Sequence, residues 1–306
     1  MSTARLHRIP PEGDPSPLSQ SFRQVLPKVL CCRYWWMSEW SSRKMSFPYW
    51  RLYWNPSGRA RVVYKKTIAL DRDRLILIPP HTPFSTHIEP TPLPGPDQYA
   101  LRGGRVRDEE MEETCREADE VLHLFIHFTL GFPFDAVAPG VFVLPVEDLH
   151  RAHLKRITGL LMQGQMQFRE KGSLEVHALL FSALSLLPDT VWNSSKLDER
   201  ILRGIRFMNR HLSDRELRNG VLAADNGMSV PAYARLFRDQ TGTSPRQYLL
   251  KMRVEQACNL LHHSTLTLEE IAAACGFSDR YHFTRTFSRL IRISPAAFRK
   301  HHIPGS

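Results

Sequence analysis

The segment LAADNGMS (residues 222–229) recurs 49 residues later as IAAACGFS (residues 271–278). After the serine the offset grows by one residue, and aromatic, arginine and Ser-Pro positions continue to match: Tyr233 with Phe283, Arg235 with Arg285, Phe237 with Phe287, Ser244 with Ser294, Pro245 with Pro295, and Tyr248 with Phe298. A match of this length indicates one supersecondary unit that is present twice.

Each copy predicts two helices joined by a sharp turn. Gly227 and Gly276 occupy the turn, where a residue without Cβ can take a positive φ. Ser229 and Ser278 are expected to N-cap the second helix of each unit, because a serine hydroxyl accepts a hydrogen bond from a free backbone N–H. In that helix the aromatic residues recur at i,i+4 and predict a buried face, which leaves one arginine of each copy exposed.

The flanking segments fit two helix-turn-helix units at about residues 213–239 and 267–289. Thr267–Glu270 (TLEE) and Ser244–Gln247 (SPRQ) have the sequence of capping boxes. Residues 248–262 predict a helix that joins the two units. The alternative is a helical bundle that contains two similar hairpins and touches no nucleic acid.

Positive charge is concentrated in the same part of the chain. The formal net charge is +10; residues 198–306 hold 17 Lys and Arg against 10 Asp and Glu, and the remainder holds 24 against 21. A basic C-terminal third predicts a polyanionic partner, although a solvated basic face explains charge alone equally well. With no apolar run of the roughly 18 residues that a membrane span needs, and five cysteines without a regular pattern, we expect a cytoplasmic protein with no membrane partner.

The second copy with its flanks, IAAACGFSDRYHFTRTFSRLIRISPAAFR (residues 271–299), closely resembles the AraC/XylS family of bacterial transcription regulators, and the resemblance covers about residues 200–302. It implies an all-α DNA-binding domain over residues 198–303. It also implies that recognition helices at about residues 230–238 and 279–288 enter successive major-groove segments of double-stranded DNA.

Carried over by position, the resemblance implies that exposed side chains of both helices contact DNA: Val230, Pro231, Ala234 and Arg235 from the first, and Arg280, Tyr281, His282, Thr284 and Arg285 from the second. The first set has a single good hydrogen-bonding side chain and the second has several, so we expect the helices to be unequal readers of base sequence. The second copy departs from the family at Arg292, where the family usually has the glycine that the first copy keeps as Gly242.

Residues 21–146 predict a β domain, after a loose leader over residues 1–20. Apolar runs broken by Pro and Gly are typical of strands in a small barrel or sandwich: RLYWN, RVVYKK, RLILIPP, VLHLFIHF and VFVLP. Pro-rich and charged residues interrupt the pattern at 89–119, where we expect an exposed insertion. The segments PYWRLYWNPSG, LILIPPHTPF and HLFIHFTLG resemble the cupin-like sensor domain of arabinose-type regulators, which implies ligand sensing. The expected class is α+β multidomain, a cupin-like β-barrel followed by an all-α double helix-turn-helix.

Between these parts, apolar residues at helical spacing predict two helices over residues 147–170 and 173–187. We expect Gly172 to separate them and Pro188 to end the second. Residues 189–197 predict a linker.

The helical segment 147–188 is expected to join two copies into a homodimer. The resemblance to arabinose-type regulators implies dimerisation here, and the apolar stripe exceeds what covering one face of a small barrel requires. We expect Leu154 and Leu161 to hold the dimer together.

An effector site is expected among the aromatic residues of the β domain. The candidates are Trp35, Trp50, Arg51, Trp54 and His81, since a tryptophan face packs on a sugar ring while polar neighbours bind hydroxyl groups. The effector is therefore a small molecule, with a carbohydrate as one class. The alternative is that these aromatics fill a barrel core or a dimer seam.

Metal and catalytic sites are not predicted. His81, His87 and Glu89 are one possible ligand set, and His123 with His127 another, but the two latter residues stand too far apart along a strand for easy joint ligation. Solvated or core histidines are favoured. No phosphate loop, dinucleotide fingerprint or nucleophile elbow is present, so no enzyme and no cofactor are expected.

The leading hypothesis is a dimeric DNA-binding transcription regulator that responds to a small molecule, with RNA polymerase as a further partner. One alternative is a constitutive DNA-binding protein whose barrel only dimerises. Another is a cupin-type enzyme with a DNA-binding tail, which paired metal ligands would favour.

Overall fold

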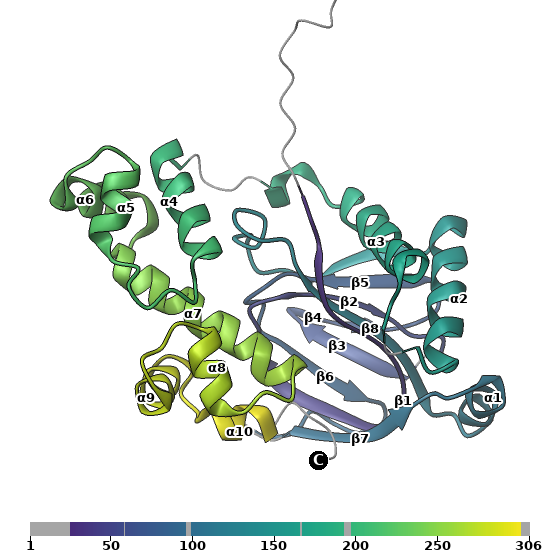
Figure 1. The fold of residues 1–306 in the computed structure, drawn as a ribbon. Coiled ribbons are helices and arrows are strands. Elements are labelled where there is room, and N and C mark those ends of the chain that lie inside the picture. The colour runs from purple at the N-terminus through teal and green to yellow at the C-terminus, as the bar shows by residue number, and fades with distance from the viewer. Residues whose placement is uncertain (1–24, 58, 96–98, 166, 193–196, 301–306) are drawn as a thin grey trace, which may run out of the picture.

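The computed structural model describes the following parts of the chain: residues 25–57, 59–95, 99–165, 167–192 and 197–300. A curved sheet forms the N-terminal part, two helices cover its outer face, and a group of helices lies beside it (Figure 1). This confirms the α+β class with an all-α C-terminal part. The leader expected over residues 1–20 lies outside the described residues. None of the described helices is long and apolar enough to span a bilayer.

Nine antiparallel strands form the sheet within the described residues. In chain order they are β1 (Lys28–Met45), β2 (Trp50–Trp54), β3 (Ala60–Tyr64), β4 (Lys66–Ala69), β5 (Arg74–Ile78), β6 (Phe84–Ile88), β7 (Tyr99–Arg105), β8 (Val121–Thr129) and β9 (Phe142–Pro145). Their order across the sheet is β4-β3-β6-β1-β8-β2-β5-β9, and β7 also pairs with β1. The long β1 thus pairs with β6, β7 and β8, and it links the two halves of the sheet.

Strand alternation gives the sheet two apolar faces. Trp50 of β2 belongs to the core under the covering helices, whereas its neighbour Tyr53 belongs to a second core on the inner face. A bulge in β1 between Met37 and Glu39 shifts the alternation by one residue, so that Met37 and then Trp40 both point inward. The inner face encloses the pocket described below.

The segment 89–119 differs from the exposed insertion that we expected. It contains β7, which pairs with β1, and the helix α1 (Glu109–Glu117), which begins at the N-cap Asp108. Gly103 makes this pairing possible, because a Cβ there would lie 2.2 Å from the carbonyl oxygen of Trp36. Because the glycines and the nearby prolines interrupt the apolar alternation, the sequence pattern did not predict this strand.

Two helices cover the outer face of the sheet, α2 (Asp148–Met162) and α3 (Glu170–Ser185), followed by the short 3-10 helix η1 (Asp189–Trp192). The sequence predicted that Gly172 separates the two helices, and this was wrong. Gly172 lies in the first turn of α3. The chain instead turns at Gly164, whose φ is +86°. At Gly172 a side chain would meet Phe168 and Leu160 at 3.2 and 3.3 Å, so the glycine serves close packing.

The C-terminal part is entirely helical within the described residues. Its helices are α4 (Glu199–Arg210), α5 (Asn219–Asp225), α6 (Val230–Thr241), α7 (Pro245–His263), α8 (Leu268–Ala274), α9 (Arg280–Ile291) and α10 (Pro295–Lys300). The pairs α5–α6 and α8–α9 are the two helix-turn-helix units, and α7 joins them (Figure 1).

Helix α7 also connects the helical part to the barrel. Phe47 and Tyr49, which precede β2, share one apolar cluster with Val254 of α7 and Phe298 of α10. His81 lies 3.2 Å from the carboxylate of Glu255 on α7. The core of the second helix-turn-helix unit is therefore completed by residues of the β domain.

Candidate functional site

Both predicted turns are left-handed at their glycines. The φ of Gly227 is +61° and that of Gly276 is +73°. A Cβ at Gly227 would meet nothing within 4 Å, but a Cβ at Gly276 would lie 2.6 Å from the carbonyl oxygen of Leu212 and 2.9 Å from Nη2 of Arg253. The second turn therefore needs glycine for its backbone conformation and for close packing.

The two recognition helices start differently. Ser229 occupies the N-cap of α6, as expected, although its side chain makes no capping hydrogen bond. Ser278 was expected to cap α9 but does not: Asp279 is the N-cap, and its carboxylate accepts from the backbone N–H of His282 at 2.7 Å. The reason is the extra residue in the second copy, which places a carboxylate, favoured at a helix N-terminus, one position later. The hydroxyl of Ser278 donates to Asp279.

The aromatic positions of the repeat form the cores of the two units. The side chains of Tyr233 and Phe237 in α6, and of Phe283 and Phe287 in α9, are fully buried. The predicted capping boxes at the starts of α7 and α8 are both present. The double helix-turn-helix expected from the repeat is confirmed.

Arg235 and Arg285 lie on the exposed faces of α6 and α9, opposite the aromatic cores. In the first turns of α6, before Arg235, Val230, Pro231 and Ala232 are exposed and Ala234 is half-buried. This face therefore carries little hydrogen-bonding capacity.

The corresponding face of α9 is richer in polar groups. Tyr281 is 84% exposed, while His282 and Thr284 are half-buried. Arg280 is exposed but is held by an ion pair of 2.8 Å with Glu269 of α8. Arg285 forms no ion pair with another described residue.

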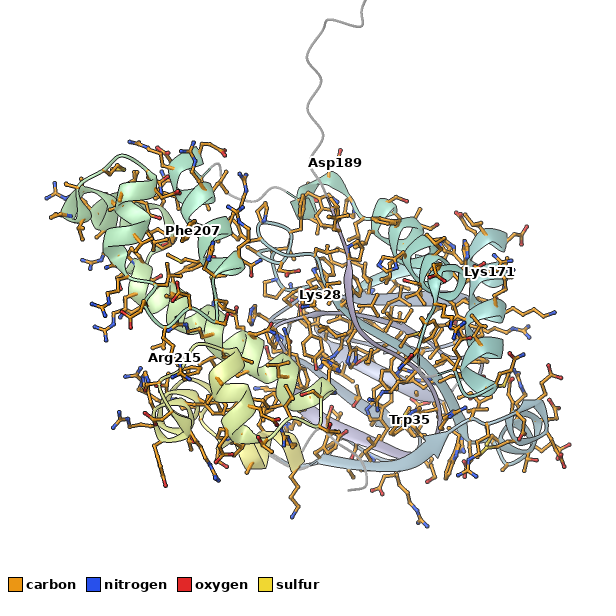
Figure 2. The ribbon with its side chains drawn as sticks, in the orientation of Figure 1. Lys28, Trp35, Lys171, Asp189, Phe207 and Arg215 are labelled. Carbon is orange, nitrogen blue, oxygen red and sulfur yellow. The ribbon has the colours of Figure 1, made fainter. Side chains whose placement is uncertain are left out.

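A basic groove runs between the two units. Its exposed arginines come from the start of the first unit, from α7 and from α9: Arg215, Arg218, Arg246, Arg285 and Arg289. Figure 2 shows Arg215 between the units, on the side away from the sheet. Sequence reasoning selected only Arg285 from this set. The excess of positive charge after residue 198 indicated a basic surface, but it did not show which arginines line the same groove.

Arg253 fixes the geometry of this groove. Its guanidinium is buried at the junction of the units, where Nε donates to the carbonyl of Leu212 at 3.0 Å and Nη2 donates to the carbonyl of Asp214 at 2.6 Å. Burial lowers the pKa of Arg253 from its usual value. The side chain ties the loop after α4 to α7, so it sets how the two units face one another.

Arg292 keeps the turn that glycine makes in the first unit. It is the C-cap of α9 with a φ of +73°, and Gly242 is the C-cap of α6 with a φ of +74°. A left-handed conformation costs a non-glycine residue about 1 kcal/mol. The departure from the family pattern therefore costs stability at this position without changing the shape of the unit.

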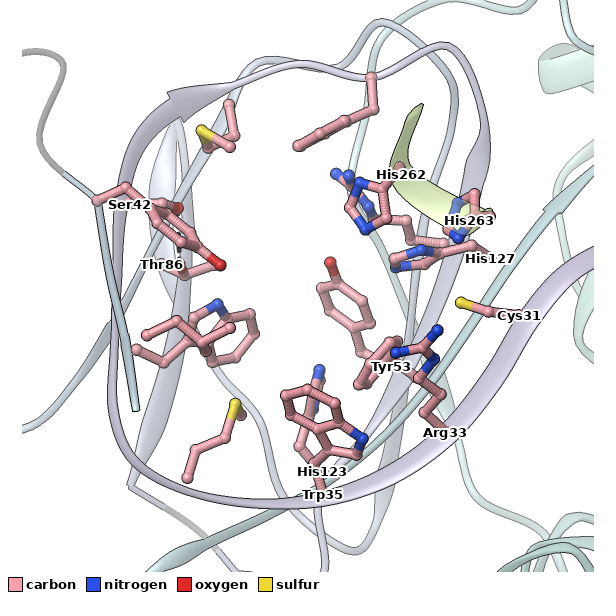
Figure 3. Close-up of a pocket in the computed structure, with 18 of the residues that line it drawn as sticks. Cys31, Arg33, Trp35, Ser42, Tyr53, Thr86, His123, His127, His262 and His263 are labelled. Atoms are coloured by element: carbon pink, nitrogen blue, oxygen red, sulfur yellow. Dashed lines mark hydrogen bonds between the residues drawn. The ribbon is translucent and has the colours of Figure 1, made fainter. Parts of the chain in front are cut away.

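A second candidate site is a cavity of about 280 Å³ inside the sheet (Figure 3). Alternate residues of β1, starting at Cys31 and Arg33, point into it, and β2, β6, β7 and β8 supply the rest of the wall. The end of α7 contributes His262 and His263. The cavity is thus shared by the barrel and the C-terminal helical part of the chain.

Not all of the predicted effector residues line the cavity, because alternate residues of a strand point to opposite faces of the sheet. Trp35 and Arg51 line the cavity, but Trp50 and Trp54 lie on the other face of β2. Nε1 of Trp50 donates to Asp135 at 3.0 Å, and Nε1 of Trp54 donates to the carbonyl of Arg72 at 2.9 Å. His81 lies outside the cavity against α7. The two tryptophans were misassigned because neighbours along a strand face opposite sides, and His81 because it belongs to the turn between β5 and β6.

Arg51 gives the cavity a buried positive charge. The side chain is 3% exposed, its guanidinium lies 3.5 Å from the ring centre of Phe47, and Nη2 donates to the hydroxyl of Tyr49 at 3.1 Å. Among the described residues no carboxylate forms an ion pair with Arg51, and its Nε has no hydrogen-bond partner. A buried guanidinium in this state favours an acceptor or anion beside it.

Aromatic residues form most of the remaining wall, with Trp40, Tyr53 and Phe125 around His123. His123 Nδ1 lies 2.9 Å from Oδ1 of Asn55, and burial lowers its pKa to about 3. The histidine is therefore neutral near pH 7. The cavity combines apolar walls with a few polar groups, as small-molecule sites do.

The metal-ligand sets considered from the sequence do not assemble. His81 pairs with Glu255 rather than with His87 and Glu89. His123 bonds to Asn55 and does not form a shared metal site with His127. A different set comes together at one side of the cavity: Cys31, His127 and His263. These residues lie on β1, β8 and α7, which are far apart in the chain. No short sequence motif therefore predicts this set of ligands.

Comparison with known proteins bears on the helical part. Residues 222–301 match a family model described as a helix-turn-helix domain. The HTH-type transcriptional activator RhaS of Escherichia coli O139:H28 is 32% identical over 127 residues, which are 42% of this chain and 44% of that protein. The HTH-type transcriptional activator RhaR of Cronobacter sakazakii is 46% identical over 65 residues, 21% of this chain and 23% of that protein. The chain spans less than half the length of these curated relatives.

Solved structures give similar matches. The DNA-binding domain of the global transcriptional factor AdpA, in complex with a target DNA, is 34% identical and covers 33% of this chain and 90% of that one, with a TM-score of 0.32. ToxT from Vibrio cholerae O395 is 13% identical and covers 90% of this chain and 98% of that one, with a TM-score of 0.49. The family model, the curated relatives and the repeated unit agree: residues 222–301 form an AraC-type helix-turn-helix domain, similar to that of the HTH-type transcriptional activators RhaS and RhaR.

Proposed function

We propose that the protein binds double-stranded DNA through α6 and α9 and regulates transcription in response to a small molecule held in the barrel. The observation that carries the DNA-binding proposal is the pair of helix-turn-helix units around a groove lined by five exposed arginines. Arginines on such a surface neutralise phosphates, while exposed side chains of the recognition helices reach base edges. The protein acts by binding rather than by catalysis, works in the cytoplasm with the DNA, and has RNA polymerase as a further partner.

The effector is a small molecule with an apolar body and an acceptor group, and a sugar acid or another organic carboxylate fits best. Aromatic faces such as those of Trp35 and Trp40 suit a sugar ring or a hydrocarbon body. The buried guanidinium of Arg51 suits a carboxylate, because charge-assisted hydrogen bonds are the stronger ones. A neutral sugar remains the second candidate, supported by the same aromatic faces.

Replacing Arg51 by Gln is expected to weaken binding of a carboxylate effector by more than about tenfold, since a hydrogen bond to a charged group contributes roughly 1.5–3 kcal/mol. Ligands are screened on the full chain by tryptophan fluorescence, as Trp35 and Trp40 line the cavity. The panel pairs each sugar acid with its neutral sugar and includes aromatic and aliphatic carboxylates.

The matched control is Arg74→Gln, on β5 and outside the cavity, which should bind as the wild type does. Equal binding by the Arg51 and Arg74 variants would contradict the role of Arg51. If no ligand in the panel binds, or if ligands bind without changing DNA affinity, the barrel would serve only assembly, as in a constitutive regulator.

We also propose that the protein is a homodimer, but through residues other than those expected from the sequence. Leu154 and Leu161 are buried inside the chain, in the core between α2 and the sheet, so their assignment to a dimer interface was wrong. Helical spacing alone does not say which of two apolar faces packs internally. The face of α3 that stays uncovered carries Leu174, 68% exposed, and Phe181, 44% exposed, seven residues apart.

Replacing Leu174 and Phe181 together by Glu is expected to shift the protein from dimer to monomer, because two charges would have to be buried at the interface. Sedimentation velocity measures the change. Leu93→Glu, at an exposed leucine outside the helices, is the control and should stay dimeric. A double variant that remains dimeric would place the interface elsewhere.

A further inference from the structure

Three potential metal ligands from distant parts of the chain meet where α7 reaches the barrel. The thiol sulfur of Cys31 and one ring nitrogen each of His127 and His263 lie within 4.8 Å of one another. Figure 3 shows the three side chains side by side at one edge of the cavity. Cys31 and His127 are directly opposite each other in the pairing of β1 with β8, which holds their Cβ atoms about 5 Å apart. His263 is the last residue of α7.

Three ring nitrogens in this cluster are buried and unpartnered. His127 is 4% exposed and its Nδ1 has no hydrogen-bond partner, and neither ring nitrogen of His263 has one. Leaving a buried polar atom unsatisfied costs about 1–3 kcal/mol, so several such atoms at one point call for a ligand. His123 differs, because its Nδ1 bonds to Asn55.

We propose that Cys31, His127 and His263 bind a thiophilic transition-metal cation of the Zn²⁺ or Cu⁺ class. One thiolate and two imidazoles are typical ligands of these cations, whereas Ca²⁺ and Mg²⁺ require oxygen ligands. Bonds of about 2.0–2.3 Å in tetrahedral geometry place ligand atoms roughly 3.5 Å apart, so atoms that lie within 4.8 Å of one another need to approach by no more than about 1.3 Å. Three protein ligands leave a fourth position for a small ligand.

The site would connect ligand binding to the DNA-binding helices. A metal there would join β1 and β8 to the end of α7, the helix between the two helix-turn-helix units. The proposal deepens the proposed ligand response, because the cluster lines the same cavity. The tests of the effector site and of the metal site are independent. Absence of metal binding would not change the result of the carboxylate screen, and a screen without ligands would not change the metal spectra.

Cobalt and zinc titrations of the tag-free, reduced full-length protein test the proposal. Co²⁺ is expected to bind with a stoichiometry of one and to give thiolate-to-cobalt charge-transfer absorption in the near ultraviolet. Cys31→Ser should abolish that absorption. Cys32→Ser, at the neighbouring cysteine in the core on the other face of the sheet, should keep it. An indicator competition with Zn²⁺ and with Cu⁺ shows which cation binds more tightly.

His263→Gln provides an independent variant if Cys31→Ser fails to fold, as judged by circular dichroism. It should weaken Zn²⁺ binding by more than about tenfold, since even partners outside the ligand shell contribute 10–100-fold. His87→Gln is the control, because His87 also has two unpartnered ring nitrogens but lies outside the cluster. Zn²⁺ should raise the midpoint of thermal unfolding of the wild type and of the His87 variant, not of the His263 variant. The proposal is overturned if the wild type gives no thiolate absorption, if Cys31→Ser retains it, or if the His263 and His87 variants bind Zn²⁺ equally.

Discussion

Replacing Gly276 by Ala is expected to destabilise the helical part of the protein by about 2–4 kcal/mol. A φ of +73° costs alanine about 1 kcal/mol, and a new methyl group in a closely packed place costs roughly 1–3 kcal/mol more. The added Cβ would lie 2.6 Å from the carbonyl oxygen of Leu212, a backbone atom that cannot rotate away. It would also press on Arg253, which holds the two units together.

Gly227→Ala is the matched control for this prediction. Gly227 makes the equivalent turn with a φ of +61°, but nothing lies within 4 Å of its added Cβ, so only about 1 kcal/mol is expected. Urea unfolding of the full chain, followed by circular dichroism, compares the two midpoints. Equal losses would mean that Leu212 and Arg253 do not pack on the second turn as described.

The second large effect is expected on DNA binding. Arg285→Ala should weaken binding to the specific site by about 1–3 kcal/mol and relax the preference at one or two base pairs. Arg285 lies on the exposed face of α9, makes no ion pair with a described residue and lines the basic groove. An arginine so placed can bond to O6 and N7 of guanine together.

Arg235→Ala should matter less, or act evenly across sequences if Arg235 contacts phosphates only. Its neighbours Val230, Pro231 and Ala234 have no hydrogen-bonding side chains and can at most sense a thymine methyl group. Binding profiles of both variants over randomised sites measure the difference. A larger loss of base preference in the Arg235 variant would show that α6, not α9, reads most of the sequence.

The sequence predicted the helical part well because its signals are local. Capping boxes, turn glycines and aromatic residues at i,i+4 act within a few residues, and a second copy repeats them. The one clear error there, at Ser278, arose because the repeat was aligned through a one-residue insertion that moved the cap to Asp279. The sequence showed Arg292 only as a departure from the family pattern, and the structure shows that the left-handed turn of Gly242 is kept there.

The β domain was less predictable because its site depends on register and long-range pairing. The bulge in β1 decides that Trp40 faces inward, and no feature of the sequence locates that bulge. The same alternation excluded Trp50 and Trp54 from the cavity. Cys31 and His263 are 232 residues apart in the chain, so only the tertiary structure brings them together.

The most direct test of the account is selection of genomic DNA fragments by the full-length protein, followed by affinity measurements on the enriched site at several salt concentrations. We expect a recurring sequence in the fragments and protection of two successive major-groove segments. If the five exposed arginines of the groove contact phosphates, log affinity should fall against log salt with a slope of about −4 or steeper. Fragments without a shared sequence, or an affinity that does not change with salt, would contradict DNA recognition by this surface.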